Sequence, residues 1–225
     1  MIFPIPELNK FHDDGLFSVW GSFGVGKTTF ALQTAFNTIR TNKNVLFFYT
    51  KPNLPVYKIK NIFDFDEKVK IENFNIIRIK DFDELYKISF KIEYLILNFL
   101  KKNKKIDLII IDSITDLYNL DLNINEKERN ISLNYQLNQI LANFAFLNKN
   151  YNIDILIINE TSKKNQNDST IEIQSGGKVM TYWIAQALKI ERTSVLNERK
   201  FILTYSIEKI ILEFKLNMTN NGFII

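Results

Sequence analysis

Cysteine is absent from this chain of 225 residues, and histidine occurs once, as His12. The absence of cysteine excludes disulfide bonds and thiolate metal sites. A single histidine cannot form a histidine metal cluster, and His12 is expected at the surface near the N-terminus. The sequence therefore gives no sign of a zinc-type centre.

Glycine and proline are also scarce, with 7 and 4 residues, which argues against a loop-rich or disordered chain. Hydrophobic residues make up 46% of the chain, and 19 Phe and 9 Tyr supply bulky core side chains. This length and composition predict one domain spanning residues 1–225. The net charge of +4 permits contact with nucleic acid without requiring it.

Long apolar runs are lacking as well. No segment approaches the roughly 20 apolar residues that a membrane-spanning helix needs, and the first residues do not resemble a signal peptide. We therefore expect a cytoplasmic protein with no membrane association.

Short apolar runs alternate with amphipathic segments along most of the chain. The runs at 16–20, 45–50, 73–80, 106–112 and 153–159 predict buried strands, and the segments at 28–40 and 126–148 predict helices. Asp81 is the expected N-cap of a further long helix. Strands that are apolar on both faces predict an α/β fold with a mainly parallel sheet between helices. After about Ala187 the runs shorten and alternate, which predicts antiparallel strands extending the sheet.

A complete phosphate-binding motif follows the first strand. The motif G-x-x-x-x-G-K-[ST] predicts nucleotide binding by Gly21, Ser22, Phe23, Gly24, Val25, Gly26, Lys27, Thr28 and Thr29. Its glycines let backbone N–H groups approach phosphate oxygens, Lys27 supplies a charge at the β- and γ-phosphates, and the next helix points its positive end at the anion. The motif predicts ATP as the nucleotide and Thr28 as a ligand of Mg²⁺.

A carboxylate is expected near the same metal ion. Asp112 ends the apolar run at 106–112, and ligands of parallel sheets bind at the carboxyl ends of the strands. Asp112 is therefore the second predicted Mg²⁺ ligand, whereas Asp107, at the other end of that strand, is expected to be structural.

The order of these motifs resembles that of RecA-like recombinases. GKTTFALQ at 26–33, LIIIDSIT at 108–115 and ILIINET at 155–161 are followed by GGKVMTYW at 176–183 and then by LKIER. The last two segments are similar to those of archaeal RadB proteins, which are short RecA-fold paralogues without the N-terminal DNA-binding domain of the main recombinase. The resemblance covers roughly residues 16 to 225. It implies a RecA-like ATPase core that assists DNA repair and homologous recombination.

The chain departs from this family at the residue that activates water. Where the family usually has a D-T-E triplet, this chain has Tyr49, Thr50 and Lys51. A protonated lysine cannot act as the base, and losing a water-positioning group typically costs about 10²–10⁴ in rate. We therefore expect ATP binding with weak or absent hydrolysis. Glu160, where the family often has glutamine, is the alternative candidate for orienting water; a non-catalytic role for Glu160 and a solvated surface position for Lys51 stay open.

The polar stretch at 161–174 corresponds to the first DNA-facing loop of the family and is expected to be mobile. Lys163, Lys164 and Lys178 are the candidate phosphate contacts to DNA. The stretch has no aromatic residue for base stacking. The resemblance implies DNA and the main recombinase as partners, and RecA-like proteins often complete their ATP site in a homo-oligomer.

Two other functions compete with this interpretation. A KaiC-like signalling ATPase would share the phosphate-binding motif without binding DNA, but the segment at 176–183 argues against it. A small-molecule kinase would usually carry an arginine-rich lid, and here Arg192 and Arg199 only flank a short connection.

Overall fold

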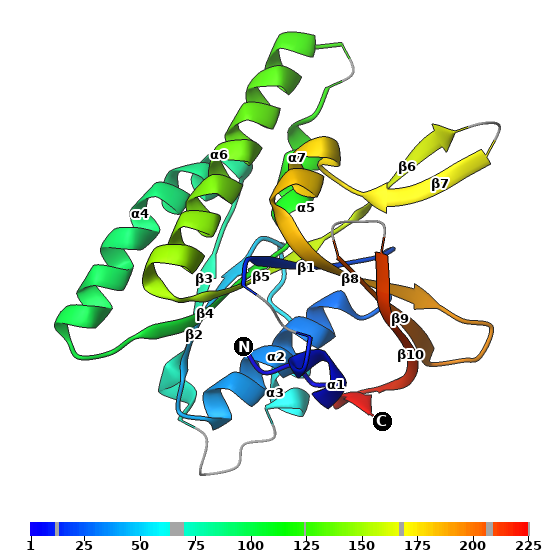
Figure 1. Cartoon of the computed structure of the whole chain (residues 1–225). Coiled ribbons are helices and arrows are strands. Elements are labelled where there is room, and N and C mark those ends of the chain that lie inside the picture. The colour runs from blue at the N-terminus through cyan, green and yellow to red at the C-terminus, as the bar shows by residue number, and fades with distance from the viewer. Residues whose placement is uncertain (12–13, 64–69, 124, 167–168, 206–208, 225) are drawn as a thin grey trace.

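The computed structural model describes residues 1–11, 14–63, 70–123, 125–166, 169–205 and 209–224. His12 and its predicted surface position lie outside this part of the chain. Within it, nine strands form one sheet in the order β11-β10-β9-β8-β1-β5-β4-β2-β3, with helices on both faces (Figure 1). The fold is α/β, with a mostly parallel sheet and antiparallel strands toward the C-terminus, as the sequence predicts.

The parallel part of the sheet places the expected strands side by side. Its strands are β1 (Leu16–Trp20), β2 (Asn44–Tyr49), β3 (Phe74–Arg78), β4 (Ile106–Asp112), β5 (Asp154–Asn159) and β8 (Ile184–Arg192). Each neighbouring pair from β8 to β3 runs parallel. Because parallel strands end at the same edge, the residues that follow β1, β2, β4 and β5 meet there.

The helices include several short segments that the periodicity did not indicate. The described helices are α1 (Pro6–Asn9), α2 (Lys27–Arg40), α3 (Val56–Ile62), α4 (Phe82–Lys101), α5 (Ile114–Asp121), α6 (Lys127–Tyr151) and α7 (Gly177–Trp183), with a 3₁₀ turn at Ile71–Asn73. The short segments that the periodicity did not indicate are α1, α3, α5 and α7. The Asp81 side chain accepts a hydrogen bond from the Glu84 N–H at 2.7 Å, which confirms it as the N-cap of α4.

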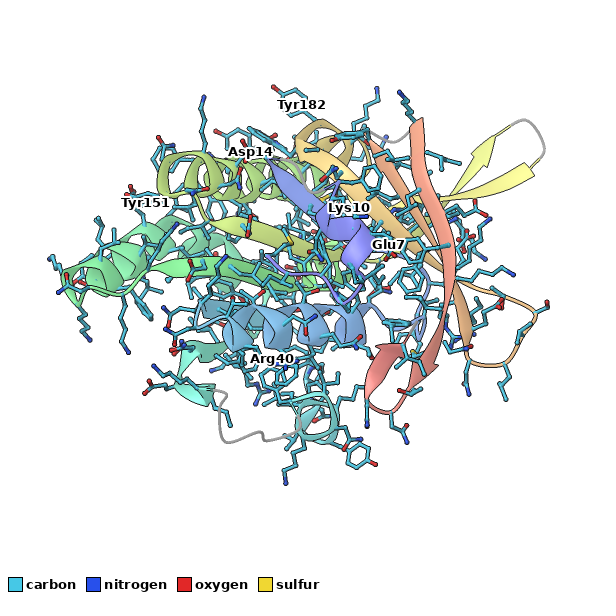
Figure 2. All side chains as sticks on the ribbon, turned by 60° about the horizontal axis from the view of Figure 1, so that its bottom comes forward. Glu7, Lys10, Asp14, Arg40, Tyr151 and Tyr182 are labelled. Carbon is cyan, nitrogen blue, oxygen red and sulfur yellow. The ribbon has the colours of Figure 1, made fainter. Side chains whose placement is uncertain are left out.

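Two hydrophobic cores lie on opposite faces of the sheet. Leu108 and Ile110 of β4 belong to the core beneath α2, whereas Ile109 and Ile111 belong to the core under α4, α5 and α6. This alternation explains why the strands read as continuous apolar runs, because both faces are covered. Figure 2 shows side chains filling the space on both sides of the sheet, while Tyr182 of α7 projects from the surface.

The C-terminal strands differ in one respect from the prediction. They are β9 (Glu198–Tyr205), β10 (Lys209–Thr219) and β11 (Gly222–Ile224), and they pair antiparallel. The segment LKIER, however, lies in β8, which pairs parallel with β1 and antiparallel only with β9. The switch to antiparallel pairing therefore occurs one strand later than the sequence pattern indicates.

The C-terminal hairpin packs onto the start of the phosphate-binding helix. The Gln33 side chain accepts a hydrogen bond from the Phe223 N–H at 2.8 Å and donates one to the Phe223 carbonyl at 3.1 Å. Phe223 also joins the core that contains Phe30 of α2. The end of the described chain thus fixes a helix near its beginning.

The polar stretch at 161–174 is not an irregular loop where it is described. The strands β6 (Thr161–Gln166) and β7 (Ser169–Gln174) form an antiparallel hairpin that projects from the body (Figure 1). The alternation I-E-I-Q at 171–174 is the sequence signal for a strand, and the polar composition obscured it. None of the helices in the described ranges is long and apolar enough to cross a membrane.

Candidate nucleotide site

The phosphate-binding loop connects β1 to α2 in a conformation that requires glycine. Gly26 caps α2 with a positive φ of 107°, which a side-chain-bearing residue rarely adopts. At Gly21 a Cβ atom would lie 2.2 Å from the Ile190 carbonyl oxygen of β8. The loop therefore packs against the neighbouring strand without room for a side chain. Phe23, at its tip, is 86% exposed.

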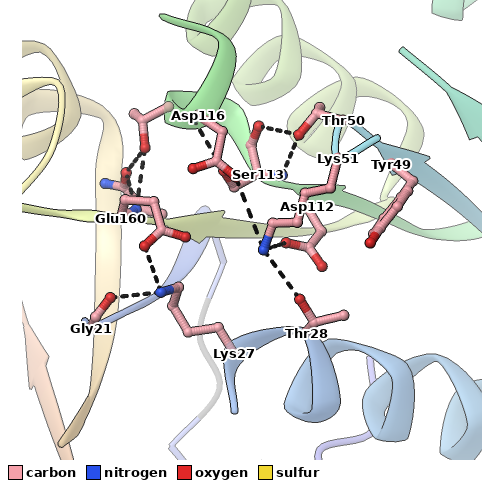
Figure 3. A network of polar contacts seen from close by, with 12 residues as sticks. Gly21, Lys27, Thr28, Tyr49, Thr50, Lys51, Asp112, Ser113, Asp116 and Glu160 are labelled. Carbon is pink, nitrogen blue, oxygen red and sulfur yellow. Dashed lines mark hydrogen bonds and ion pairs between the residues drawn. The ribbon is translucent and has the colours of Figure 1, made fainter. Parts of the chain in front are cut away.

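Lys27 is held inside the loop by three oxygen atoms. Its Nζ donates to the Gly21 carbonyl oxygen at 2.6 Å and to Glu160 Oε2 at 2.7 Å (Figure 3). It also donates to the Ser22 carbonyl oxygen at 3.0 Å. Only 4% of the Lys27 side chain is exposed. Glu160 comes from the end of β5, which is adjacent to β1 in the sheet. The predicted phosphate ligand thus has a carboxylate partner in this structure.

Lys51 lies against the two predicted metal ligands. Its Nζ is 3.3 Å from Asp112 Oδ1 and donates to Thr28 Oγ1 at 3.4 Å (Figure 3). A further carboxylate oxygen, Oδ2 of Asp116 in α5, lies 4.0 Å away. Only 26% of the Lys51 side chain is exposed. The interpretation of Lys51 as a solvated surface residue is therefore wrong.

The contact between Lys51 and Asp112 arises because β2 and β4 are neighbours in the sheet and end side by side. Tyr49 and Asp112 are register partners at the ends of β2 and β4. One residue further on, Thr50 Oγ1 donates to the Ser113 carbonyl at 3.0 Å and accepts from the Ser113 N–H at 2.8 Å. These bonds tie the two strand ends together and place Lys51 beside Asp112.

Burial and neighbouring charges shift the pKa values of Lys51 and Glu160. Burial alone would lower the pKa of Lys51, but Asp112, Asp116 and Glu160 together raise it above its ordinary value. Lys51 is therefore a cation throughout the neutral range. Burial raises the pKa of Glu160, and the hydrogen bond from Lys27 opposes that effect in part.

A buried polar network leads from this site to the β6–β7 hairpin. Asn159 Oδ1 accepts from the Glu160 N–H at 2.8 Å and from the Thr115 hydroxyl. The Asn159 side-chain amide donates to Gln174 Oε1 at 3.2 Å, and the Ser18 hydroxyl donates to the same oxygen at 2.8 Å. Because Gln174 ends β7, the base of the hairpin shares its hydrogen bonds with the strand that precedes Glu160.

The structure brings some of the predicted residues together and leaves others apart. Lys27, Thr28, Asp112 and Glu160 all lie at one edge of the sheet, and the loop residues from Gly21 to Thr29 surround the start of α2. Lys163 lies exposed in β6, and Lys178 lies exposed in α7. The backbone of Lys164 belongs to β6, but its side chain lies outside the described residues.

Asp116 is the charged site residue that the sequence analysis missed. It follows Asp112 by four residues, after the turn that starts α5, and the Ser113 hydroxyl accepts a hydrogen bond from its N–H at 3.2 Å. The sequence S-I-T-D at 113–116 resembles a helix N-terminal box, which was a usable signal for a helix starting at this strand end.

The oxygen atoms expected to bind Mg²⁺ suit a cation. Asp112 is fully buried, and neither of its carboxylate oxygens accepts a hydrogen bond from the described residues. No cluster of three or more Asp, Glu or His side chains that could hold a metal ion occurs in the described ranges. Thr28 and Asp112 could thus contribute two ligands, but the Lys51 ammonium already faces both.

Comparison with known proteins identifies the family of this chain. The profile of the Rad51 family matches residues 13–209. The chain belongs to the Rad51 family. Within it the chain is RadB-like: it is 32% identical over 177 residues to "DNA repair and recombination protein RadB" of Methanococcus maripaludis strain C7, covering 77% of this chain and 75% of the relative.

Two further relatives carry the same name. The protein of Methanosphaera stadtmanae is 30% identical over 174 residues, covering 77% of this chain and 71% of the relative. The protein of Methanocaldococcus jannaschii is 30% identical over 174 residues, covering 77% and 76%. The resemblance to RadB and the RecA-like fold are thereby confirmed, and the phosphate-binding loop belongs to a nucleotide-binding family.

Proposed function

We propose that this chain is an ATP-binding RadB-type paralogue that assists DNA repair and homologous recombination in the cytoplasm, with weak or absent ATP hydrolysis. It would act as one RecA-like core domain over residues 1–225 that binds DNA, the main recombinase, or both. Family membership and the names of the relatives support the repair role. The placement of Lys27 within the loop supports nucleotide binding.

Weak hydrolysis is the part of the proposal that rests on a single observation. Lys51 stands at the position expected for the water-activating glutamate, and the surrounding carboxylates keep it protonated. A protonated amine cannot accept a proton from the attacking water. Glu160 remains the candidate water-orienting residue, although its carboxylate is hydrogen-bonded to Lys27.

Phosphate release with ATP, in the presence and absence of single-stranded DNA, tests this part. In saturating Mg²⁺, whose charge offsets that of the buried Asp112, we expect slow turnover that Lys51→Glu increases, because the variant restores a carboxylate at the position of the base. Fast turnover by the unaltered protein would contradict weak hydrolysis. Lys104→Glu, which changes an exposed lysine before β4, controls for the change in net charge.

The proposed DNA contact involves the hairpin and α7. Lys163 and Lys178 are exposed, and Lys164 belongs to the same hairpin strand as Lys163. The network from Glu160 through Asn159 to Gln174 supports a coupling between nucleotide and hairpin, because a nucleotide that displaces Glu160 acts on groups that share hydrogen bonds with β7.

Fluorescence anisotropy with a labelled single strand at low salt, with and without ATP, tests DNA binding. Each phosphate contact that is lost lowers both the affinity and its salt dependence. We expect Lys163→Ala with Lys178→Ala to weaken binding, whereas Lys101→Ala with Lys104→Ala, at the opposite edge of the sheet, leaves it unchanged. Absence of DNA affinity, together with absence of binding to the main recombinase in a pull-down, would contradict the proposed role.

Size-exclusion chromatography with and without ATP tests whether a homo-oligomer forms.

A further inference from the structure

A positively charged side chain lies where the motif predicts a metal ion. The two oxygen-bearing side chains predicted to bind Mg²⁺ are Thr28 and Asp112, and Lys51 Nζ lies within 3.4 Å of the one and 3.3 Å of the other. Because Asp112 is fully buried, its charge needs a cation nearby to offset the cost of burial. Lys51 supplies that cation from within the chain.

Lys51 is held at this position by the fold. It follows β2 directly, and the paired hydrogen bonds between Thr50 and Ser113 fix the end of β2 to the end of β4. Asp116 adds a second carboxylate at 4.0 Å on the α5 side. The ammonium group is therefore surrounded by oxygen atoms from three separate elements, α2, β4 and α5.

A divalent ion bound to the same oxygens would lie close to this ammonium. Mg²⁺ binds oxygen at about 2.0–2.1 Å, so an ion on Asp112 Oδ1 would lie no more than about 5.5 Å from Lys51 Nζ. Two positive groups at that distance repel strongly in a partly buried site. Thr28 and Asp112 thus suit a cation in chemistry, but the described site does not fit Mg²⁺ while Lys51 is present.

We propose that the Lys51 ammonium is a built-in cation that replaces Mg²⁺ at the nucleotide site, so that this chain binds ATP without a divalent ion. The groove beside the phosphate-binding loop is lined by Lys27, Lys51 and Lys58. Their three positive charges would offset the negative charge of a triphosphate bound there. This inference rests on the proposed nucleotide binding and concerns its metal requirement.

Titration of the purified full chain with a fluorescent ATP, in saturating Mg²⁺ and separately in excess EDTA, tests the proposal. We expect dissociation constants that agree within about threefold, which is well below a tenfold change in affinity. A loss of tenfold or more in EDTA would overturn the inference while leaving nucleotide binding intact. No binding under either condition would instead refute the proposed function.

Variants at position 51 identify the responsible group. Lys51→Met keeps the length of the side chain and removes the charge, so we expect its affinity in EDTA to fall at least about tenfold and to recover when Mg²⁺ is added. Lys104→Met, an exposed lysine before β4, should behave as the unaltered protein does. Equal affinity of Lys51→Met and the unaltered chain in EDTA would overturn the proposal.

A double variant guards against misfolding. Lys51→Met leaves Asp112 buried without its partner and can unfold the chain, whereas Lys51→Met with Asp112→Asn removes both charges. We expect the folded double variant to bind the fluorescent ATP weakly in EDTA and to recover little with Mg²⁺, because its metal-binding carboxylate is gone. Tight binding by the double variant in EDTA would contradict the role of Lys51. Circular dichroism and thermal unfolding confirm the fold of each variant.

Discussion

Two lysine–carboxylate pairs lie at the same edge of the sheet, and they differ in how far the carboxylate is exposed to solvent. Lys27 pairs with Glu160, whose pKa is raised by burial and whose side chain is 16% exposed. Lys51 pairs with Asp112, which is fully buried. A phosphate bound as proposed would replace Glu160 at Lys27, because the partly exposed Glu160 carboxylate can turn to solvent, whereas the Asp112 carboxylate has no exposed surface.

The largest expected effect is on stability, at the second pair. Lys51→Ala leaves a buried carboxylate without its cation, and breaking a buried pair in this way costs about 3 kcal/mol or more of the free energy of unfolding. Urea denaturation in nucleotide-free, EDTA-containing buffer measures the loss. Adding Asp112→Asn should recover most of it, because no buried charge then remains. A Lys51→Ala variant as stable as the unaltered chain would show that the pair does not stabilise the fold.

The next effect is on nucleotide affinity, at the first pair. Lys27→Ala removes the charged donor to the phosphates. We expect the dissociation constant for ATP to rise roughly 100-fold, which is a loss of about 2.7 kcal/mol of binding free energy. Stability should fall less than in Lys51→Ala, because the released Glu160 can become neutral. Titration with fluorescent ATP measures the affinity, with Lys104→Ala as the control. Unchanged affinity would remove the basis for nucleotide binding at this loop.

A smaller change separates two roles of Glu160. Glu160→Gln weakens the hold on Lys27, so we expect ATP to bind about tenfold more tightly, about 1.4 kcal/mol. If Glu160 also orients water, the slow hydrolysis rate falls in the same variant, and the two readouts move in opposite directions. Weaker binding by Glu160→Gln would show that the carboxylate assists the nucleotide and does not compete with it.

The smallest effect is a dependence of stability on pH. Because the pKa of Glu160 is raised in the folded chain, folding favours the protonated form. The stability contributed by this group is complete below its unfolded pKa and is lost as the pH rises through the folded pKa. The difference in melting temperature between Glu160→Gln and the unaltered chain should therefore increase from acidic to neutral pH. A constant difference would mean that Glu160 is not the titrating group.

The residues of both pairs were identified in the sequence, but their partners were not. Lys27 and Asp112 follow from motif spacing and from the end of an apolar strand, which are local features. That Lys27 meets Glu160 depends on β1 lying beside β5, and that Lys51 meets Asp112 depends on β2 lying beside β4. Strand order is a long-range property, so local periodicity does not contain it.

The hairpin at 161–174 and the C-terminal contact with α2 also depend on pairing and packing that local sequence patterns did not predict. The polar composition of the first predicted a mobile loop, although β6 and β7 pair with each other. The second joins Gln33 to Phe223, 190 residues later in the chain. Short segments of this kind gain their structure from packing and pairing more than from their own propensity.

The sequence by itself determined the α/β class, the position of the phosphate-binding loop and the presence of a lysine where a catalytic glutamate is expected. The first two follow from hydrophobic period and glycine spacing, which act over a few residues, and the third follows from the resemblance to RecA-like recombinases. Only the tertiary structure decided that this lysine faces Thr28, Asp112 and Asp116, since three separate elements must come together to surround it. Position 51 therefore lacks the expected glutamate and instead holds a lysine ammonium group beside Asp112 and Thr28.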